Sequence, residues 1–236
     1  MAEHDAAPAT RRAVLFAAGT AGVITLASAL AASAAEGTGV DEGAGLSPDP
    51  APPGAAAAPR CVLTTEWGSG PYYLDLDLVR SDITGGRQGV PFRLDLTVVR
   101  TSQGCRPVEG AAVDVWQADA AGEYSAKGAT WLRGTQFTDS AGRCTFRTVV
   151  PGWYAELAPH IHFKVRPDNH SETSSQLFFP EGWLKQLYTR PPYSQREVPA
   201  HPNERDDRYR ESGAALTLAP DADGPGFRAA YTIGIT

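Results

Sequence analysis

The sequence has few of the residues that usually carry chemistry or charge. Of its 236 residues, five are histidine, three are cysteine and one, the first, is methionine. It has no surplus of basic residues, because 21 lysines and arginines stand against 27 aspartates and glutamates. Such a chain has little with which to neutralise phosphates, which excludes nucleic-acid binding through a basic patch. An apolar content of 42% suffices for a core and excludes a wholly disordered chain.

The N-terminal region is typical of an export signal. Arg11 and Arg12 precede an apolar run that reaches about Ala35 and contains the small-residue sequence Ala32–Ala34. These features predict a twin-arginine-type signal peptide over residues 1–35 and a secreted, extracellular protein. The alternative is a membrane anchor, but the run is rich in Ala, Gly, Ser and Thr and would insert weakly. We therefore expect no stable membrane anchor after cleavage.

A linker and a single domain are expected after the signal. Residues 36–60 are rich in Ala, Pro and Gly without periodicity, which predicts a flexible linker before a domain over residues 61–236. Export places the three cysteines in an oxidising compartment, where they allow one disulfide and one leftover thiol. The sequence does not fix the pairing. We favour Cys61 with Cys105, which would tie the start of the domain to a loop, and expect Cys144 to be a small buried residue in a strand.

Short alternating segments separated by turn residues predict an all-β fold. The strand candidates are residues 93–99, 112–118, 135–138, 144–149, 160–165, 215–218 and 229–235. Their number and spacing predict a β-sandwich with long loops and at most one or two short helices. One short helix is expected over Gly182–Tyr188. The Pro- and charge-rich stretch Thr189–Tyr209 is expected to be a long surface excursion.

His160 and His162 are candidate metal ligands because they lie two residues apart on a predicted strand. Side chains alternate across a strand, so both imidazoles leave from the same face. Two neutral imidazole nitrogens close together form half of a metal site, although a His-x-His pair is a weak signal alone. Tyr154 precedes His160 by six residues, and Tyr124 follows the turn Asp119–Gly122.

The residues around the histidine pair favour a hard trivalent ion. No acidic ligand stands next to the pair, and the nearest is Glu156. Phenolate is a hard oxygen donor, so two histidines with two tyrosines suit Fe(III) better than zinc. Two phenolates and one hydroxide would also balance the three charges of the ion in a partly buried site. A cupin-like copper or zinc site is the weaker alternative.

Several ordered motifs resemble the intradiol ring-cleavage dioxygenases. They lie at residues 110–125, 132–139, 146–154 and 159–163, and include Trp116-Gln117-Ala118-Asp119, Pro151-Gly152-Trp153-Tyr154 and Pro159-His160-Ile161-His162. The resemblance covers nearly all of residues 61–236. It is greatest to the secreted branch of the family, related to the protocatechuate and catechol dioxygenases. It implies an oxidoreductase of aromatic catabolism that uses O2 to cleave catechol-type rings between the two hydroxylated carbons, giving muconic-acid-type products.

The resemblance also implies roles for single residues. Tyr124, Tyr154, His160 and His162 match the four protein ligands of one non-haem Fe(III) ion per chain. In the family, a catechol binds as a dianion and displaces the tyrosine at the position of Tyr154, which can then take a substrate proton. Gln176 matches a glutamine near the iron and is expected to assist catalysis.

The turn before the histidine pair departs from the family pattern at Leu157. Relatives usually carry an arginine three residues before the first histidine, where it can stabilise negative charge that builds on the substrate. Either another basic residue such as Arg133 covers this role, or the enzyme is slow, or its substrate differs. The alternative function is therefore a secreted iron-binding β-sandwich module with little or no turnover. Tyr72 matches a position near the pocket mouth, and Tyr72, Arg133 and Leu157 are the expected substrate-pocket residues.

Overall fold

The all-β architecture predicted from the sequence is confirmed. The computed structural model describes residues 61–126, 128–154, 156–196 and 200–236. The predicted signal peptide and linker, residues 1–35 and 36–60, lie outside the described residues. Within the described part the chain forms nine strands, two α-helices and three short 3-10 helices. None of the helices in this part is long and apolar enough to cross a membrane.

The elements follow one another along the chain as short strands and, later, helices. The strands are β1 Pro91–Arg100, β2 Arg106–Pro107, β3 Ala112–Gln117, β4 Arg133–Phe137, β5 Arg143–Val149, β6 His160–Arg166, β7 Thr173–Phe178, β8 Asp221–Asp223 and β9 Gly226–Ile235. The helices are η1 Thr101–Gln103, α1 Glu181–Leu187, η2 Tyr193–Gln195, η3 Asn203–Arg205 and α2 Asp207–Leu216.

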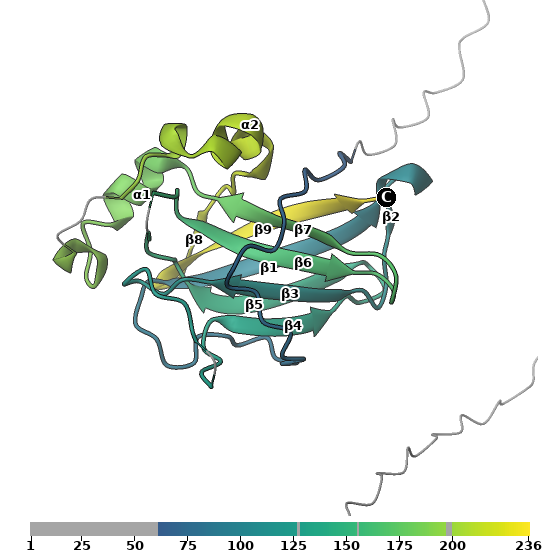
Figure 1. Cartoon of the computed structure of the whole chain (residues 1–236), viewed down its shortest axis with the longest axis horizontal. Coiled ribbons are helices and arrows are strands. Elements are labelled where there is room, and N and C mark those ends of the chain that lie inside the picture. Colours follow the sequence, from purple (N-terminus) through teal and green to yellow (C-terminus); the bar gives the residue numbers. More distant parts are fainter. Residues whose placement is uncertain (1–60, 127, 155, 197–199) are drawn as a thin grey trace, which may run out of the picture. The chain divides into compact units, whose positions relative to one another are not determined.

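Two sheets pack against each other around one apolar core (Figure 1). In the first sheet, β1 lies beside β9 and pairs with both β5 and β2 on its other side, while β8 pairs with β9. The second sheet has the order β4-β3-β6-β7. All pairings between these strands are antiparallel except that of β1 with β9. Alternation along β1 places Phe92, Leu94, Leu96 and Val98 in the core, as expected for a strand with one buried face.

Strand β6 differs from β1 because both of its faces are buried. Ile161, Phe163 and Val165 belong to the core between the sheets. The alternate residues His160 and His162 point to the outer face of the second sheet, yet each is only 2–3% exposed. The outer face is therefore covered, and polar side chains on it can be buried.

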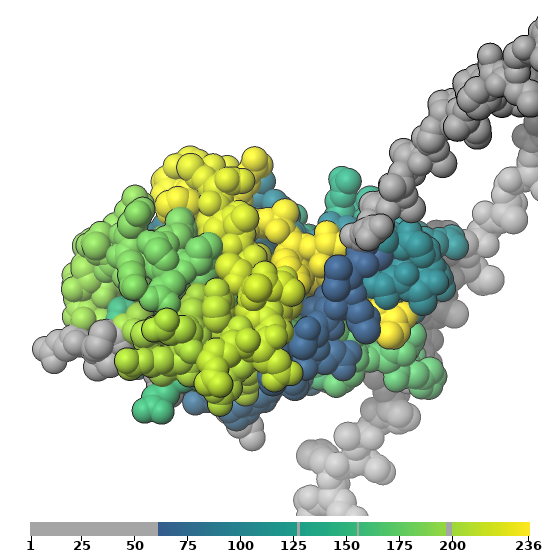
Figure 2. All heavy atoms as spheres, turned by 90° about the horizontal axis from the view of Figure 1, so that it is seen from above, coloured from purple at the N-terminus to yellow at the C-terminus, as the bar shows by residue number. Residues whose placement is uncertain are grey.

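The cover is residues 61–78, which we call the N-terminal strap. Figure 1 shows this dark blue segment crossing in front of β7, β6 and β3. Tyr73 donates from its hydroxyl to Asp114 Oδ2 on β3 at 2.9 Å. The indole Nε1–H of Trp67 donates to Ser212 Oγ on α2 at 2.7 Å. The strap and α2 therefore lie side by side on the surface, as Figure 2 shows in blue and yellow-green.

Two expectations for the C-terminal third were wrong. The stretch Thr189–Tyr209 is not a surface excursion throughout, because Tyr193 is 1% exposed and donates to Val150 O at 2.6 Å. Residues 215–218 are not a strand. They contain the end of α2, followed by an isolated bridge from Thr217 to Phe178. The expected helix at residues 182–188 is α1, displaced by one residue.

The favoured cysteine pairing is confirmed. Cys61 and Cys105 form a disulfide across a sequence separation of 44 residues, which ties the start of the strap to the loop after η1. Cys144 is free and buried in β5, with its side chain in the core. The disulfide fixes one end of the strap that covers the outer face of the second sheet.

Candidate metal centre

The two histidines are placed by the register of the second sheet. His162 lies opposite Trp116 on β3 and opposite Gln176 on β7, so these three side chains share the outer face. The Trp116 ring lies parallel to the His162 imidazole, with centroids 4.9 Å apart and an interplanar angle of 2°. Gly70 of the strap crosses His162, since a Cβ on this glycine would lie 3.5 Å from His162 Cε1. The His162 imidazole is thus packed against both the Trp116 ring and the strap.

The two tyrosines lie on loops that can come close to each other because glycine residues stand at their contacts. Tyr124 follows the turn at Gly122, which has a φ of 83°, and a Cβ at Gly122 would collide with the carbonyl oxygen of Trp153. Gly152 packs equally closely against Ala120 O, and its amide donates to Asp119 O at 2.9 Å. Two positions without a side chain therefore bring the Tyr124 loop and the Tyr154 loop together.

The four side chains form one compact cluster. The Nε2 atoms of His160 and His162 are 3.0 Å apart. The Tyr154 hydroxyl lies 3.4 Å from His160 Nε2. The Tyr124 and Tyr154 rings meet edge to face with centroids 5.1 Å apart, and the Tyr124 ring is 6.3 Å from that of His162. The structure thus brings together all four residues predicted as metal ligands.

Burial drives these four groups towards their neutral forms. It lowers the pKa of His160 to about 4 and the pKa of His162 well below its ordinary value. It also raises the pKa of Tyr124 well above that of a free phenol, with a further contribution from Tyr154, and raises the pKa of Tyr154 itself. Neutral imidazoles are ready to bind a metal. Buried phenols release their protons only to a strong Lewis acid, which is the behaviour of a trivalent cation.

The donor atoms fit a metal ion. Two nitrogens bound to one ion at about 2.1 Å and at about a right angle lie about 3 Å apart, which is the spacing of the two Nε2 atoms. His160 Nδ1 donates to Ala158 O at 2.7 Å, so the lone pair of its Nε2 is directed away from the backbone. Tyr124 Oη is buried beside Tyr154 and makes no well-formed hydrogen bond within the described residues. An ion would supply that missing partner.

The tyrosines are needed for any such site. Within the part of the chain that the structure describes, no group of three or more His, Cys, Asp or Glu side chains is arranged to hold a metal ion. The histidine pair therefore reaches four protein donors only with Tyr124 and Tyr154. This donor set agrees with the sequence argument for a hard trivalent ion.

Tyr72 and Arg133 lie at the cluster but act differently. Tyr72 is 41% exposed, stacks on Tyr124 with centroids 4.3 Å apart, and meets Tyr154 edge on at 5.8 Å. Arg133 is 4% exposed, and its three guanidinium nitrogens donate to Ser125 Oγ, Ser125 O and Tyr72 O at 2.6–2.9 Å. Arg133 therefore positions the segments that carry Tyr72 and Tyr124.

Gln176 and Leu157 complete the residues predicted from the sequence. Gln176 is 1% exposed beside His162, and its Nε2 has no hydrogen-bond partner in the described part of the chain. This buried N–H donor can serve an oxygen atom bound at the cluster. Leu157 is partly buried in the turn before His160 and brings no charge there.

Sequence reasoning missed the place of Trp116 beside a candidate metal ligand. Its indole is 1% exposed and is buried against His162 on the outer face of the second sheet. The signal was present in the alternation of β3. Val113 and Val115 point to the core, which places Asp114 and Trp116 on the opposite face.

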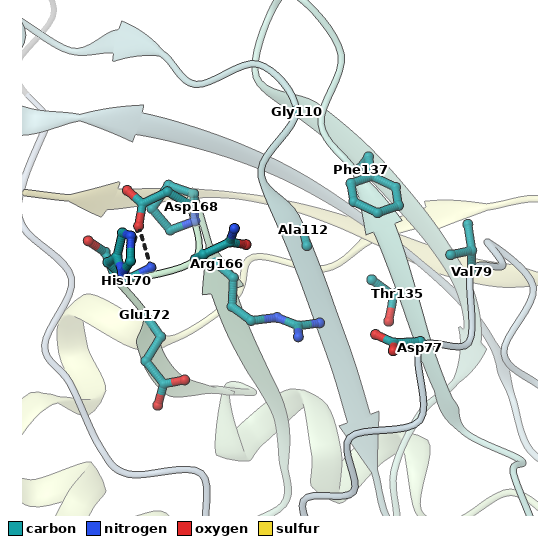
Figure 3. A pocket seen from close by; sticks show the side chains of 13 residues that line it. Asp77, Val79, Gly110, Ala112, Thr135, Phe137, Arg166, Asp168, His170 and Glu172 are labelled. Atoms are coloured by element: carbon teal, nitrogen blue, oxygen red, sulfur yellow. Dashed lines mark hydrogen bonds between the residues drawn. The ribbon is translucent and has the colours of Figure 1, made fainter. Parts of the chain in front are cut away.

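The outer face also carries a hollow away from the four clustered donors. A cavity of about 770 Å³ lies at the far end of β6 and β3, where Arg166 pairs with Ala112. Figure 3 shows Arg166 with the exposed Phe137 and Val79 and the hairpin residues Asp168 and His170. None of the four clustered donors lines this cavity. The metal candidate and this hollow are distinct places on the same face.

Comparison with known proteins gives the same family from sequence and from structure. A family model described as dioxygenase matches residues 69–185. The protocatechuate 3,4-dioxygenase beta chain of Burkholderia cepacia is 33% identical over 124 residues, covering 45% of this chain and 52% of that one. A chlorocatechol 1,2-dioxygenase of Pseudomonas sp. (strain P51) is 29% identical over 109 residues, covering 36% and 43%. The matched part of the chain thus spans about half the length of each of these curated relatives.

Solved structures match over a larger share. An intradiol ring-cleavage dioxygenase from Tetranychus urticae superposes with a TM-score of 0.71 at 29% identity, covering 75% of this chain and 95% of that chain. The dioxygenase domain of a fusion protein from Streptomyces sp. SirexAA-E gives a TM-score of 0.56 at 27% identity, covering 74% and 98%. With its matching fold and sequence, the chain belongs to the intradiol ring-cleavage dioxygenase family.

Proposed function

We propose that the protein binds one non-haem Fe(III) ion through Tyr124, Tyr154, His160 and His162 and uses O2 to cleave catechol-type rings. Cleavage would fall between the two hydroxylated carbons and give muconic-acid-type products, in the catabolism of aromatic compounds. Family membership supports this reaction class. The observation that carries the proposal is the buried cluster of two imidazoles and two phenols, with His160 Nε2 within 3.4 Å of both His162 Nε2 and Tyr154 Oη.

The chain's own residues would divide the work. When bound, Fe(III) supplies the Lewis acidity that stabilises a catecholate and prepares its ring for O2. His160 and His162 hold their neutral nitrogens in place through Ala158 O and the Trp116 ring. Tyr154, which is partly exposed, would be held as a phenolate by the ion and could then accept a proton from an incoming catechol.

Tyr72 and Gln176 would shape the space for the substrate. Tyr72 presents an aromatic surface at the mouth of the cluster, where it already stacks on Tyr124. A flat catechol ring entering there would pack against aromatic side chains. Gln176 would donate from its unpartnered Nε2 to an oxygen atom beside His162.

Oxygen uptake by the iron-loaded protein tests this function. We expect one O2 consumed per catechol, together with the rise of muconate absorbance. We also expect a red-brown visible band from phenolate-to-Fe(III) charge transfer, which Tyr154→Phe should alter. Tyr231→Phe is the matched control, because Tyr231 bonds to Ala215 O on a different part of the surface and should leave the band unchanged.

The rival function makes a different prediction in the same experiment. A binding module with little turnover, which Leu157 favours, would show the coloured band but no oxygen uptake with any of a panel of substituted catechols. A colourless protein that holds copper or zinc after loading would contradict the iron assignment itself. Each outcome selects one of the three functions.

We further propose that the protein acts outside the cytoplasm. The arginine pair followed by an apolar run supports export. The Cys61–Cys105 disulfide is consistent with an oxidising compartment. Replacing Arg11 and Arg12 by lysine should retain the protein inside the cell, whereas the unchanged chain should be found in the culture medium. Equal amounts of both in the medium would contradict twin-arginine export.

A further inference from the structure

Leu157 stands where relatives usually carry an arginine, so a positive charge that faces the metal cluster has to come from another residue. Arg133 is close, but its three guanidinium nitrogens already donate to Ser125 and Tyr72. Arg208, in the first turn of α2, is the other candidate. It comes from a part of the chain that was expected to be surface loop.

Two neighbours of Arg208 fix its place beside His160. Asp206, the N-cap of α2, accepts the backbone N–H of Ala158 at 2.9 Å, and Ala158 O accepts His160 Nδ1 at 2.7 Å. Tyr209 packs edge to face on Phe178 at 5.1 Å, and Phe178 meets the His160 ring at 6.2 Å. Arg208 thus stands between two residues that are each linked to His160 through one neighbour.

The side of α2 that carries Arg208 meets the strap. Ser212 follows Arg208 by one helical turn, so both lie on one side of the helix, and Ser212 Oγ accepts the indole N–H of Trp67. Further along the strap, Gly70 crosses His162 and Tyr72 stacks on Tyr124. Arg208 is therefore on the side of α2 that borders the metal cluster.

The guanidinium of Arg208 is available to a ligand. The side chain is partly buried, and within the described residues it makes no hydrogen bond or ion pair.

We propose, on the basis of the function proposed above, that Arg208 contacts the anionic oxygens of a bound catecholate and supplies the positive charge that Leu157 lacks. A guanidinium directed at developing negative charge lowers the barrier of such a reaction. It can do so from α2 as well as from the turn before His160. The family's charge-stabilising role would then have moved from that turn to α2. This assigns a catalytic role to a residue of the C-terminal helical region.

Substrate binding can be separated from turnover with a redox-inert ion. The full chain is loaded with Ga(III), and the affinity for catechol is measured by calorimetry for the wild type, Arg208→Met, Arg208→Lys and Arg210→Met. Because a hydrogen bond to a charged group accounts for about 10-fold in affinity, Arg208→Met should weaken binding by about that factor. Arg208→Lys keeps the charge and should stay within about 3-fold of the wild type. Arg210, two residues on, is exposed on the opposite side of α2, so Arg210→Met should have no effect.

Oxygen uptake by the iron-loaded forms of the same variants distinguishes the two proposals. A loss of kcat/KM in Arg208→Met that Arg208→Lys restores supports the inference. Equal affinities of Arg208→Met and Arg210→Met overturn it, even if the wild type is active. If Arg208→Met weakens catechol binding to the Ga(III) form but the iron-loaded wild type consumes no O2, the proposed reaction is wrong and the contact between Arg208 and the catecholate is supported. If no metal form of the wild type binds catechol, both the reaction and the contact are wrong.

The position of the charge is tested with a second substrate. Calorimetry is repeated with 3,4-dihydroxybenzoate, which adds a carboxylate to the ring. A similar weakening for both compounds in Arg208→Met supports contact with the ring oxygens. A weakening confined to the carboxylated compound overturns this assignment, because Arg208 would then bind the ring substituent.

Discussion

The indole ring of Trp116 lies parallel to the imidazole of His162, with centroids 4.9 Å apart and planes inclined by 2°. The two residues are opposite each other across β3 and β6, so the stack is set by strand register. It restrains rotation of the imidazole about its long axis and shields one of its faces from water. A buried ring that orients a metal ligand belongs to the site as much as the ligand does.

Replacing this indole should weaken metal binding. We expect Trp116→Leu to lower the affinity for Fe(III) by about 10-fold or more, as is typical when a group that orients a ligand is removed. Trp116→Phe should lose less, because a ring is kept. Affinity is measured by competition with a chelator. Trp183→Leu removes a comparable stack, on Phe179 in the core, and should leave iron affinity unchanged. Equal affinities of the Trp116→Leu and Trp183→Leu proteins would contradict the role.

Arg133 should be important for stability as well as for the site. It donates to Ser125 and Tyr72 from a nearly buried position, and lysine cannot reproduce three fixed donors. We expect Arg133→Lys to lower the free energy of unfolding by about 2 kcal/mol. Arg147→Lys is the control, since Arg147 is 72% exposed and its ion pair with Asp82 is long, at 3.8 Å. Urea unfolding that gives the same loss for both variants would show that the contacts of Arg133 contribute little.

The strands and the histidine pair could be predicted because they depend on local pattern. Alternation in β1, β3 and β6 reveals which residues share a face, so the common direction of His160 and His162 follows from their spacing. The meeting of Tyr124 and Tyr154 does not follow from any period. It depends on close contact between two loops at Gly122 and Gly152, which only the family resemblance indicated in advance.

The C-terminal third shows why the remainder was harder to predict. Ala215–Leu218 is a segment of four residues, three of them apolar, which is too short to distinguish the end of a helix from a strand. The start of α2 had a readable signal, because Asp206 is an N-cap whose carboxylate accepts from Arg208 N and Tyr209 N. Its link to Ala158 is a contact across 48 residues, which no local pattern reveals.

The buried histidines should make the metal-free protein sensitive to acid. His160 has a pKa of about 4 in the folded protein and about 6.5 when unfolded, so between these values only the unfolded chain takes up the proton. Stability should therefore fall as the pH drops from 6.5 to 4. His160→Gln should reduce the difference in unfolding free energy between pH 7 and pH 4 by about 3 kcal/mol.

The matched control for this pH experiment is an exposed histidine. His170 lies in the hairpin between β6 and β7, and His170→Gln should leave the pH dependence unchanged. Urea unfolding at a series of pH values, on protein stripped of metal, gives both comparisons. A His160→Gln protein that loses as much stability on acidification as the wild type would mean that His160 is protonated in the fold.

Cys144 should be inert in the folded protein even though it is the free thiol among the described cysteines. Burial, together with the nearby carboxylates of Asp139 and Asp95, raises its pKa to about 12. An ordinary thiol is largely ionised at pH 9.5, but this one stays protonated and enclosed. We expect no alkylation of the native protein at that pH and one alkylated cysteine after unfolding in guanidinium without reductant, as read by mass spectrometry. Cys144→Ala should show no alkylation in either state.

Alkylation of the native wild type would place Cys144 within reach of solvent. Two further alkylated cysteines on unfolding would contradict the Cys61–Cys105 bridge.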